Sequence, residues 1–277
     1  MSNIFQFQMR NEGGKISPSD AILSADISVD YPQRKGVLQG ACIDVFRREI
    51  VGLVGQSGSG KSTFALAILR LLDHTGASVD GRIELLGQDL TRCNERQLRD
   101  VRGRLASLIP QSPATALNPA LRIGTQMREA WRAHSSEPWS SQRQLITELF
   151  TTANLSPPEI FLKRFPNELS VGQAQRVLII MALLHSPPLL IADEPTSALD
   201  VITQREILDL LVRIGKQQNM GMLFISHDLS AIAAVCDRLA ILHGGKIVES
   251  GELKSVLAAP QHSYTRELIA AVPKWTL

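Results

Sequence analysis

A glycine- and serine-rich segment that ends in a lysine and hydroxyl side chains is the part of this chain best suited to hold phosphate. It reads Gly55, Gln56, Ser57, Gly58, Ser59, Gly60, Lys61, Ser62 and Thr63. Glycine lets the backbone curl so that successive N–H groups point at phosphate oxygens. Lys61 would add a mobile cation for the β- and γ-phosphates, and Ser62 a hydroxyl ligand for Mg²⁺. The spacing predicts a site for a nucleoside triphosphate.

The flanking residues decide between this site and a flexible turn. An apolar, strand-like run at residues 50–54 precedes the loop, and a helix-like run at 64–69 follows it. Strand, loop and helix in this order are the context that the phosphate-loop pattern requires. The helix that begins near Lys61 would also direct the positive end of its dipole at the phosphates.

Two adjacent carboxylates follow an apolar run at residues 189–192. Asp193 could hold the Mg²⁺ that bridges nucleotide phosphates, while Glu194 orients and polarises the attacking water. Surface charge or a helix start is the alternative interpretation. The fully apolar run before the two acids indicates a strand covered on both faces, which favours the catalytic interpretation.

His227 and Gln111 could complete this chemistry. His227 follows a strand-like run at 223–226, and the carboxyl ends of parallel strands face the ligand. From there it could reach the γ-phosphate or the attacking water, although a histidine beside Asp228 could instead belong to a helix cap. Gln111 lies in a proline-containing loop, where its amide could coordinate Mg²⁺ and move with the segment that follows.

A second helix start could also bind an anion. Residues 169–176 contain Ser170, Gly172 and Gln173, and a helix-like run follows at 177–184. A serine cap and the first amides of a helix form an anion site. Because the chain has one nucleotide loop, this second site would serve the nucleotide of a partner. An ordinary capped helix is the alternative.

The elements that must position these residues alternate between strands and helices. Strand-like patterns occupy residues 21–23, 27–29, 41–45, 50–54, 82–86, 189–192 and 222–226, with a loop at 32–36 and a turn at Asp80-Gly81. A helix-like run at 203–217 joins the last two strands, which implies a parallel sheet. We interpret residues 113–185, where prolines separate helical segments, as a helical insert in an α/β core, and residues 1–20 as a flexible lead-in. Within the insert, residues 142–153 place Leu145, Ile146, Leu149 and Phe150 on one helical face.

The composition is that of an ordinary globular chain. Its 277 residues are 44% hydrophobic and carry a net charge of +2, too balanced to indicate nucleic acid. Cys42, Cys93 and Cys236 have no metal spacing and are typical of reduced thiols in a cytosolic protein. Residues 1–20 show no targeting signal, and the longest apolar stretch, 177–184, is shorter than the roughly 20 residues that cross a bilayer. Work at a membrane would require docking on another chain.

Together these positions resemble the nucleotide-binding subunit of ABC (ATP-binding cassette) transporters, across residues 22–273. The matching motifs, in the order of that family, are Walker A at 55–62, the Q-loop at Gln111, the signature at 169–173, Walker B at 189–194, the D-loop at 197–200 with its Asp200, and the H-loop at His227. Tyr31 matches the aromatic that stacks on adenine. Val171 replaces the first signature glycine, and Pro110 stands where an aromatic usually precedes the Q-loop glutamine.

Within the family, the sequence most resembles peptide and nickel importers. The similar phrases lie at 116–119, 166–170, 192–201 and in a tail at 260–268 that is close to P-x-H-P-Y-T-x-x-L. The resemblance implies an α/β P-loop NTPase (RecA-like) core with a mostly parallel sheet, an antiparallel β subdomain and an inserted α-helical subdomain at about 113–185. All would belong to one ABC ATPase domain at 21–277, which ends in an importer-like tail at about 252–277.

The resemblance also implies an ATPase that uses ATP and Mg²⁺. Its catalytic residues would be Glu194, His227 and Gln111, and its metal ligands Ser62, Gln111 and Asp193. The subunit would form a head-to-tail dimer with an identical or paralogous subunit. Each ATP would lie between the Walker A loop of one subunit and the signature segment of the other, whose serine, glycine and glutamine would contact it. The subunit would work at the cytoplasmic face of the cell membrane, bound to a permease. An extracytoplasmic binding protein would deliver the substrate to that permease, and nucleic acid would not be a partner.

Two other functions fit part of the sequence. A non-transport ABC ATPase in DNA repair, translation or cofactor assembly could use a cluster of arginines. Its members are Arg92, Arg96, Arg99, Arg102 and Arg104. Glu95 and Asp100 interrupt this cluster, which favours a solvated helix face. A P-loop kinase or GTPase would leave residues 169–173 and 197–200 without a role, and the guanine-reading N-K-x-D pattern is absent.

Overall fold

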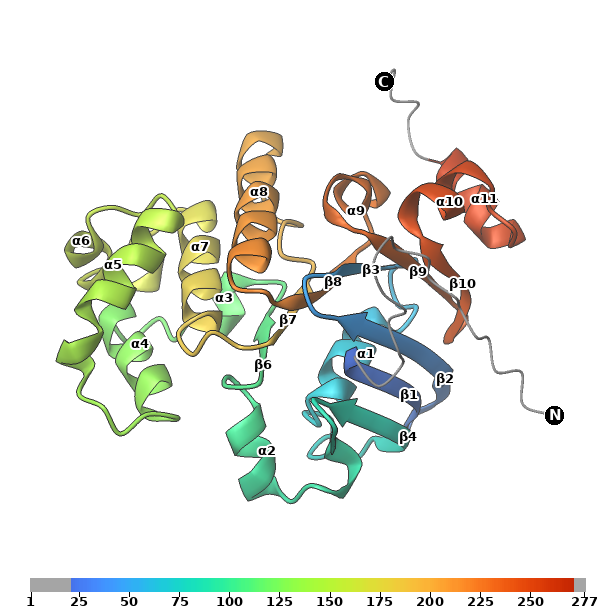
Figure 1. Cartoon of the computed structure of the whole chain (residues 1–277), viewed down its shortest axis with the longest axis horizontal. Coiled ribbons are helices and arrows are strands. Elements are labelled where there is room, and N and C mark those ends of the chain that lie inside the picture. Colours follow the sequence, from blue (N-terminus) through green and yellow to red (C-terminus); the bar gives the residue numbers. More distant parts are fainter. Residues whose placement is uncertain (1–20, 272–277) are drawn as a thin grey trace.

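The computed structural model describes residues 21–271 and contains two β-sheets (Figure 1). The predicted lead-in at 1–20 and the last residues of the predicted tail, 272–277, lie outside this range. The strands are β1 (Ala21–Tyr31), β2 (Arg34–Phe46), β3 (Ile50–Val54), β4 (Ser78–Leu85), β5 (Gln88–Asp89), β6 (Ala106–Ile109), β7 (Leu189–Asp193), β8 (Gly221–Ser226), β9 (Arg238–His243) and β10 (Lys246–Glu252). A six-stranded sheet has the order β10-β9-β3-β8-β7-β6, and a four-stranded sheet the order β2-β1-β4-β5.

The six-stranded sheet confirms the predicted parallel core. Strands β6, β7, β8, β3 and β9 pair in parallel, and only β10 pairs antiparallel, with β9. All five residues of β3 and of β7 are buried, as expected for continuous apolar runs covered on both faces. Since parallel strands end at one edge of the sheet, the loops that follow β3, β6, β7 and β8 meet there.

Alternate side chains of this sheet belong to two different hydrophobic cores. In β8, Met222 and Phe224 pack into the core that includes the helices between β6 and β7. Leu223 and Ile225 pack into the core shared with the four-stranded sheet and the helix after the phosphate loop. This alternation is the period of two that a strand imposes, and it places the sheet between two apolar layers.

The four-stranded sheet is antiparallel where β1 pairs with β2 and β4, as the resemblance implied, and it corrects one turn prediction. Strand β4 runs straight through Asp80-Gly81, where we expected a turn. Gly81 has φ of +114°, and a Cβ there would lie 2.1 Å from the carbonyl oxygen of Asp26 on β1. The glycine therefore permits close approach of two strands instead of reversing the chain. The predicted loop at 32–36 is also shorter, because β2 already begins at Arg34.

The helices predicted at 64–69, 142–153 and 203–217 are present with ends shifted by at most three residues. The helix predicted at 177–184 is Val171–Ala182 instead, because the capping box of Ser170 and Gln173 starts it earlier. The helices are α1 (Lys61–Ile68), α2 (Glu95–Val101), α3 (Pro113–Ala116), α4 (Ile123–Arg132), α5 (Arg143–Thr152), α6 (Pro158–Leu162), α7 (Val171–Ala182), α8 (Val201–Gln217), α9 (Leu229–Val235), α10 (Leu253–Ala258) and α11 (Ser263–Ala270), with short 3₁₀ turns at Leu90–Arg92, Trp139–Gln142 and Pro166–Glu168. Ile146, Leu149 and Phe150 of α5 are buried, as predicted. No helix within residues 21–271 combines the length and apolar character needed to cross a membrane.

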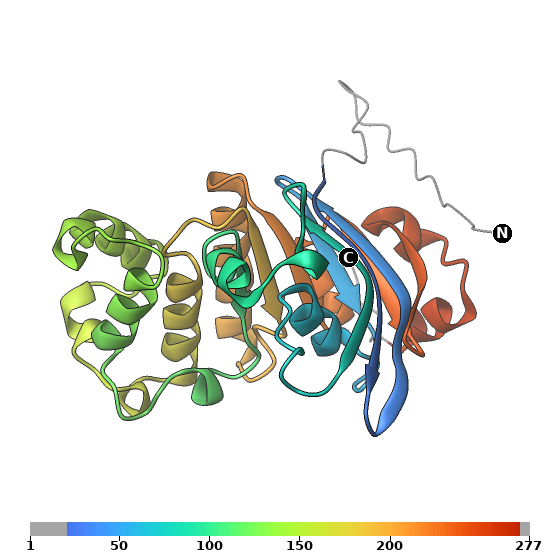
Figure 2. The same cartoon turned by 90° about the horizontal axis from the view of Figure 1, so that it is seen from below.

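The helices between β6 and β7 gather at one end of the molecule, and α10 and α11 lie at the other (Figures 1 and 2). All elements from α3 to α7 are helical, which agrees with the helical character expected for residues 113–185. The division of the chain into subdomains at those boundaries stays a prediction.

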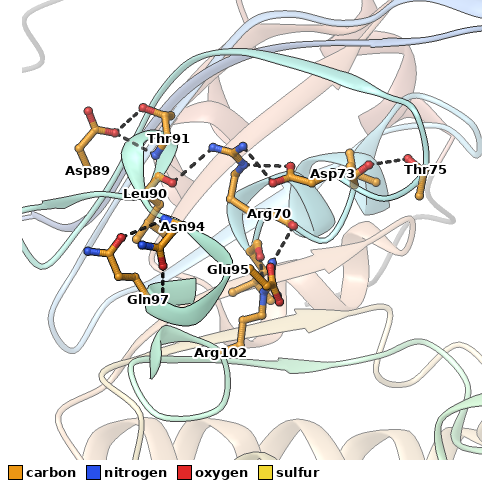
Figure 3. A network of polar contacts seen from close by, with 12 residues as sticks. Arg70, Asp73, Thr75, Asp89, Leu90, Thr91, Asn94, Glu95, Gln97 and Arg102 are labelled. Atoms are coloured by element: carbon orange, nitrogen blue, oxygen red, sulfur yellow. Dashed lines mark hydrogen bonds and ion pairs between the residues drawn. The ribbon is translucent and has the colours of Figure 1, made fainter. Parts of the chain in front are cut away.

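A polar network ties the end of α1 to α2 (Figure 3). The Arg102 guanidinium donates to the carbonyls of Leu69 and Arg70 at 2.8 and 2.7 Å and to Glu95 at 2.8 Å. Leu69 is the C-cap of α1 and Arg70 follows it, so both carbonyls lie beyond the hydrogen bonds of the helix and need other donors. Arg70 in turn pairs with Asp73 at 2.9 Å. Arg102, one of the clustered arginines, is therefore engaged in holding two helices together.

Replacing Arg102 with alanine should lower the free energy of unfolding by about 2 kcal/mol, because two carbonyls and a carboxylate lose a charged donor. Arg99 is the matched control. It also faces Glu95, but its side chain is 78% exposed against 19% for Arg102. Its replacement by alanine should cost no more than about 0.5 kcal/mol. Urea unfolding of both variants measures the difference, and equal losses would contradict this account.

Candidate functional site

The phosphate loop curls as its glycines require. Helix α1 begins at Lys61, and its N-cap, Gly60, has φ of +109°. A Cβ at Gly60 would lie 2.9 Å from the Val37 carbonyl oxygen, so both the backbone angle and the space demand glycine here. The first amides of α1 consequently open toward the edge where the parallel strands end.

Lys61 is buried at the centre of this edge. Its Nζ donates to the carbonyl oxygens of Gly55 and Gln56 at 2.9 and 3.0 Å and lies 3.8 Å from Glu194 Oε1. Burial lowers the pKa of Lys61, while the carboxylates of Glu194 and Asp193 act in the opposite direction. The ammonium group therefore lies in a protected, anion-lined position from which it can reach a phosphate.

Glu194 brings together the residues that sequence analysis selected as catalytic. Its Oε2 accepts a hydrogen bond from Gln111 Nε2 at 2.9 Å and lies 3.1 Å from His227 Nδ1. Its own backbone has φ of +48°, a left-handed conformation that is uncommon outside glycine. Its N–H donates to the carbonyl of Ile225, which holds this conformation in place. Strain at a residue of this kind is typical of functional sites.

Asp193 offers a buried oxygen that fits Mg²⁺. It ends β7 and is only 8% exposed. Burial and the neighbouring Glu194 raise the pKa of Asp193, whereas a hydrogen bond from Ser62 and the charge of Lys61 lower it. Asp193 Oδ1 makes no hydrogen bond within residues 21–271. This carboxylate oxygen of Asp193 and the neighbouring Ser62 hydroxyl together offer two of the hard oxygen ligands that Mg²⁺ prefers.

Lys61, Glu194, Gln111 and His227 line one cleft of about 520 Å³, whereas Asp193 and the predicted contacts Gly55, Gln56 and Ser59 do not line it. Its walls are formed by Tyr31, Arg34, Val37, Ser57, Gly58, Gly60, Lys61, Ser62, Thr63, Gln111, Glu194 and His227. Tyr31 stands at the end of β1, and its hydroxyl lies 3.5 Å from Thr63 Oγ1. Arg34 was not anticipated; it donates to the Gly58 carbonyl at 3.3 Å. The sequence indicates a role for Arg34 only through its position three residues after Tyr31, the predicted adenine-stacking residue.

Comparison with known proteins agrees with this geometry. Residues 38–197 match the family model described as "ABC transporter". The chain belongs to the ABC transporter family. Within that family it is 47% identical over 253 residues to the peptidoglycan transport ATP-binding protein YejF of Agrobacterium fabrum, covering 90% of this chain and 46% of the relative. It is 40% identical over 227 residues to the dipeptide transport ATP-binding protein DppD of Escherichia coli K12, covering 82% of this chain and 69% of the relative.

Solved structures of ABC ATP-binding proteins share the fold. One, the ATP-binding subunit of an ABC transporter, superposes with a TM-score of 0.70 at 28% identity, covering 86% of this chain and 92% of its own. Another, the dimeric bacterial ABC transporter cassette MJ0796, gives a TM-score of 0.73 at 25% identity, covering 83% and 98%. The fold of residues 21–271 is therefore the ABC ATPase fold, with its parallel core and antiparallel sheet.

The signature segment lies in a different cleft of about 560 Å³, and none of the residues that line it lines the first. Ser170 caps α7, with its Oγ accepting from the Gln173 N–H at 3.2 Å, while Gln173 Oε1 accepts from the Ser170 N–H at 3.1 Å. A Cβ at Gly172 would lie 2.7 Å from Thr203 Cγ2, so α7 and α8 approach closely only with glycine there. Helix α7 therefore has an ordinary capping box, and its first residues also line the second cleft.

Asp200 lies in this second cleft, not in the first. It caps α8, with Oδ1 accepting from the N–H groups of Ile202 and Thr203 at 3.1 and 3.0 Å. The donor from Thr203 is the main reason that the pKa of Asp200 is lowered, so the side chain stays ionised. The structure therefore divides the predicted nucleotide contacts between two separate surfaces of one chain.

Proposed function

We propose that this chain binds and hydrolyses ATP in the Lys61–Glu194 cleft to drive import through a separate membrane permease. The observation that carries the proposal is the convergence of Lys61, Gln111 and His227 on the carboxylate of Glu194. The cargo we propose is peptides or a related small substrate, with nickel as the alternative. Support comes from similar proteins named for peptidoglycan and dipeptide transport, and for glutathione import in Escherichia coli.

Binding would use both ends of the cleft. The Tyr31 ring would stack on adenine, and the loop amides would receive the phosphates together with Lys61. Ser62 and Asp193 would hold Mg²⁺, with Gln111 as a further ligand. Bound Mg²⁺ would neutralise charge on the phosphate oxygens.

Catalysis would depend on Glu194 as the group that polarises the attacking water. The Gln111 amide and the His227 ring contact the same oxygen, Oε2, and fix the orientation of the carboxylate. A positioned base accelerates such a step by removing the proton of the nucleophile as the bond forms. His227 would also be close enough to contact the γ-phosphate.

The second cleft supports a dimer with composite sites. Ser170, Gly172 and Gln173 would close over the ATP of a second subunit, identical or paralogous, with Asp200 beside them. Apolar side chains are exposed next to this cleft: Val201 is 82% exposed and Ile202 is 74% exposed. Exposed apolar groups of this kind favour a covering partner. The dimer would dock on the cytoplasmic side of a permease, in contact with the helices after Gln111, and a binding protein outside would supply the cargo.

Replacing Ser170 with alanine tests the composite site. ATP turnover should fall about tenfold, because a charge-assisted contact to the partner's nucleotide is lost. ATP affinity of the monomer should not change, because Ser170 does not line the first cleft. Asn94→Ala is the matched control, since Asn94 and Gln97 form the same kind of capping box on α2. Each variant should lose about 1 kcal/mol of stability.

Steady-state ATPase assays and equilibrium ATP titrations measure both effects. Equal turnover of the Ser170 and Asn94 variants would contradict the composite site. Absence of ATP hydrolysis by the wild-type chain, assayed with the permease subunits that co-purify with it, would contradict the proposed function itself.

A further inference from the structure

The C-terminal helix α11 is anchored beside β9 and β10, the strands at one edge of the central sheet (Figure 1). Glu249 of β10 accepts hydrogen bonds from the N–H groups of Gln261 and His262 at 2.8 and 2.9 Å. Burial raises the pKa of Glu249, but the Gln261 N–H, the Thr265 hydroxyl and the N–H and charge of His262 together lower it below its ordinary value. His262 Nδ1 then accepts from the Tyr264 N–H at 3.1 Å, which caps α11. Hydrogen bonds at Gln261, His262 and Tyr264 therefore fix the turn that precedes α11 and, with it, the position of Tyr264.

Tyr264 reaches from this helix to the phosphate loop. It is 6% exposed, and its ring stacks on His243 at the end of β9, with ring centroids 3.9 Å apart and planes inclined by 27°. Its hydroxyl oxygen accepts a hydrogen bond from the Gln56 N–H at 3.1 Å. Gln56 and Tyr264, 208 positions apart in the chain, are thus in contact at the beginning of the phosphate loop.

A hydrogen bond to Tyr264 and a hydrogen bond from Lys61 hold the same peptide group. The peptide between Gly55 and Gln56 presents its carbonyl to Lys61 Nζ at 2.9 Å and its N–H to Tyr264. In a planar trans peptide these two groups point in opposite directions. Rotation of the peptide would break both bonds. The backbone also has little space to shift, because a Cβ at Gly55 would lie 2.3 Å from the Leu242 carbonyl oxygen.

We propose that Tyr264 is a positioning residue for nucleotide binding: its hydroxyl fixes the Gly55–Gln56 peptide and thereby the phosphate loop and Lys61. The inference rests on the proposed ATP binding and adds a residue of the C-terminal helix to that site. The hydroxyl, not the ring, carries the effect. A phenylalanine would keep the stack on His243 and lose only the acceptor for the Gln56 N–H.

Tyr264→Phe should therefore raise the KM for ATP about fivefold and leave kcat within about twofold, the change expected for one lost hydrogen bond of ordinary strength. A loop that is less well ordered weakens ground state and transition state alike, which appears in KM alone. Equilibrium titration with ATP should show the same loss of affinity. His243→Ala, which removes the ring that orients Tyr264, should change KM in the same direction.

Glu267→Gln is the matched control on α11. Glu267 is exposed, and its side chain is not hydrogen-bonded to the turn at residues 260–262. This variant should keep the wild-type KM and ATP affinity. An unchanged KM and ATP affinity in Tyr264→Phe, or an equal shift in Glu267→Gln, would overturn the inference. If the wild-type chain binds ATP without hydrolysing it, the proposed function fails, and the titrations still decide the role of Tyr264.

Discussion

Replacing Glu194 with glutamine should lower ATP turnover about a thousandfold while ATP affinity stays close to that of the wild type, because a positioned base supplies acceleration of this order. Glutamine has nearly the same shape and keeps an oxygen that can accept from Gln111. It cannot take a proton from water, so the loss falls on kcat. The variant should also accumulate as an ATP-bound dimer, which size-exclusion chromatography with and without ATP would detect.

Glu84→Gln provides the control for this substitution. Glu84 pairs with Arg82 on β4 and does not line the cleft, so its turnover should equal that of the wild type. Turnover of the Glu194 variant within about threefold of the wild type would remove Glu194 from the role of base, since the expected effect is far larger. Loss of ATP binding would indicate that the carboxylate acts on the phosphate loop through Lys61.

Replacing Lys61 with alanine should weaken ATP binding about a hundredfold, since the phosphates lose charge-assisted hydrogen bonds from a buried ammonium. The substitution also leaves the carbonyls of Gly55 and Gln56 without their donor. Glu194 also loses the ammonium group that lies 3.8 Å from its Oε1. Turnover at saturating ATP should therefore fall too, because the γ-phosphate is no longer held in line with the attacking water.

Lys254→Ala on the exposed side of α10 is the control for the loss of one positive charge. Fluorescence titration with ATP compares the two variants, and their melting temperatures separate binding from folding. ATP affinity that is equal in both would contradict the assignment of the phosphate site. A melting temperature that falls only in the Lys61 variant would show that the loop itself depends on the bonds from Nζ.

The strands that support the site could be predicted from the sequence because they are continuous apolar runs. Leu189–Asp193 and Ile50–Val54 are buried on both faces, so their composition is sufficient to reveal them. The site residues that follow them were selected by their position at strand ends. The structure places Gln111, Glu194 and His227 in contact. Their chemical roles stay predictions until the variants above are measured.

Features that depend on tertiary packing could not be predicted. Gly81 has the sequence context of a turn, and only the approach of β1 shows why glycine stands inside a strand. The left-handed backbone of Glu194 is imposed by its neighbours, and nothing in its residue type indicates it. The bond between Tyr264 and Gln56 joins distant segments, so no local pattern could reveal it.

The pairing of β7 with β8, in which Asp193 lies opposite Ile225, has a consequence for how this chain tolerates insertions and deletions. Insertion of one residue into β7 would move every following side chain to the other face of the sheet. Asp193 would then occupy the position of Glu194, and a proposed metal ligand would replace a proposed base. The exposed loop at residues 133–138, between α4 and α5, carries no such constraint, because added residues there leave the strand pairing unchanged and lie outside both clefts. Length variation should therefore be harmless in this loop and inactivating within the five residues of β7.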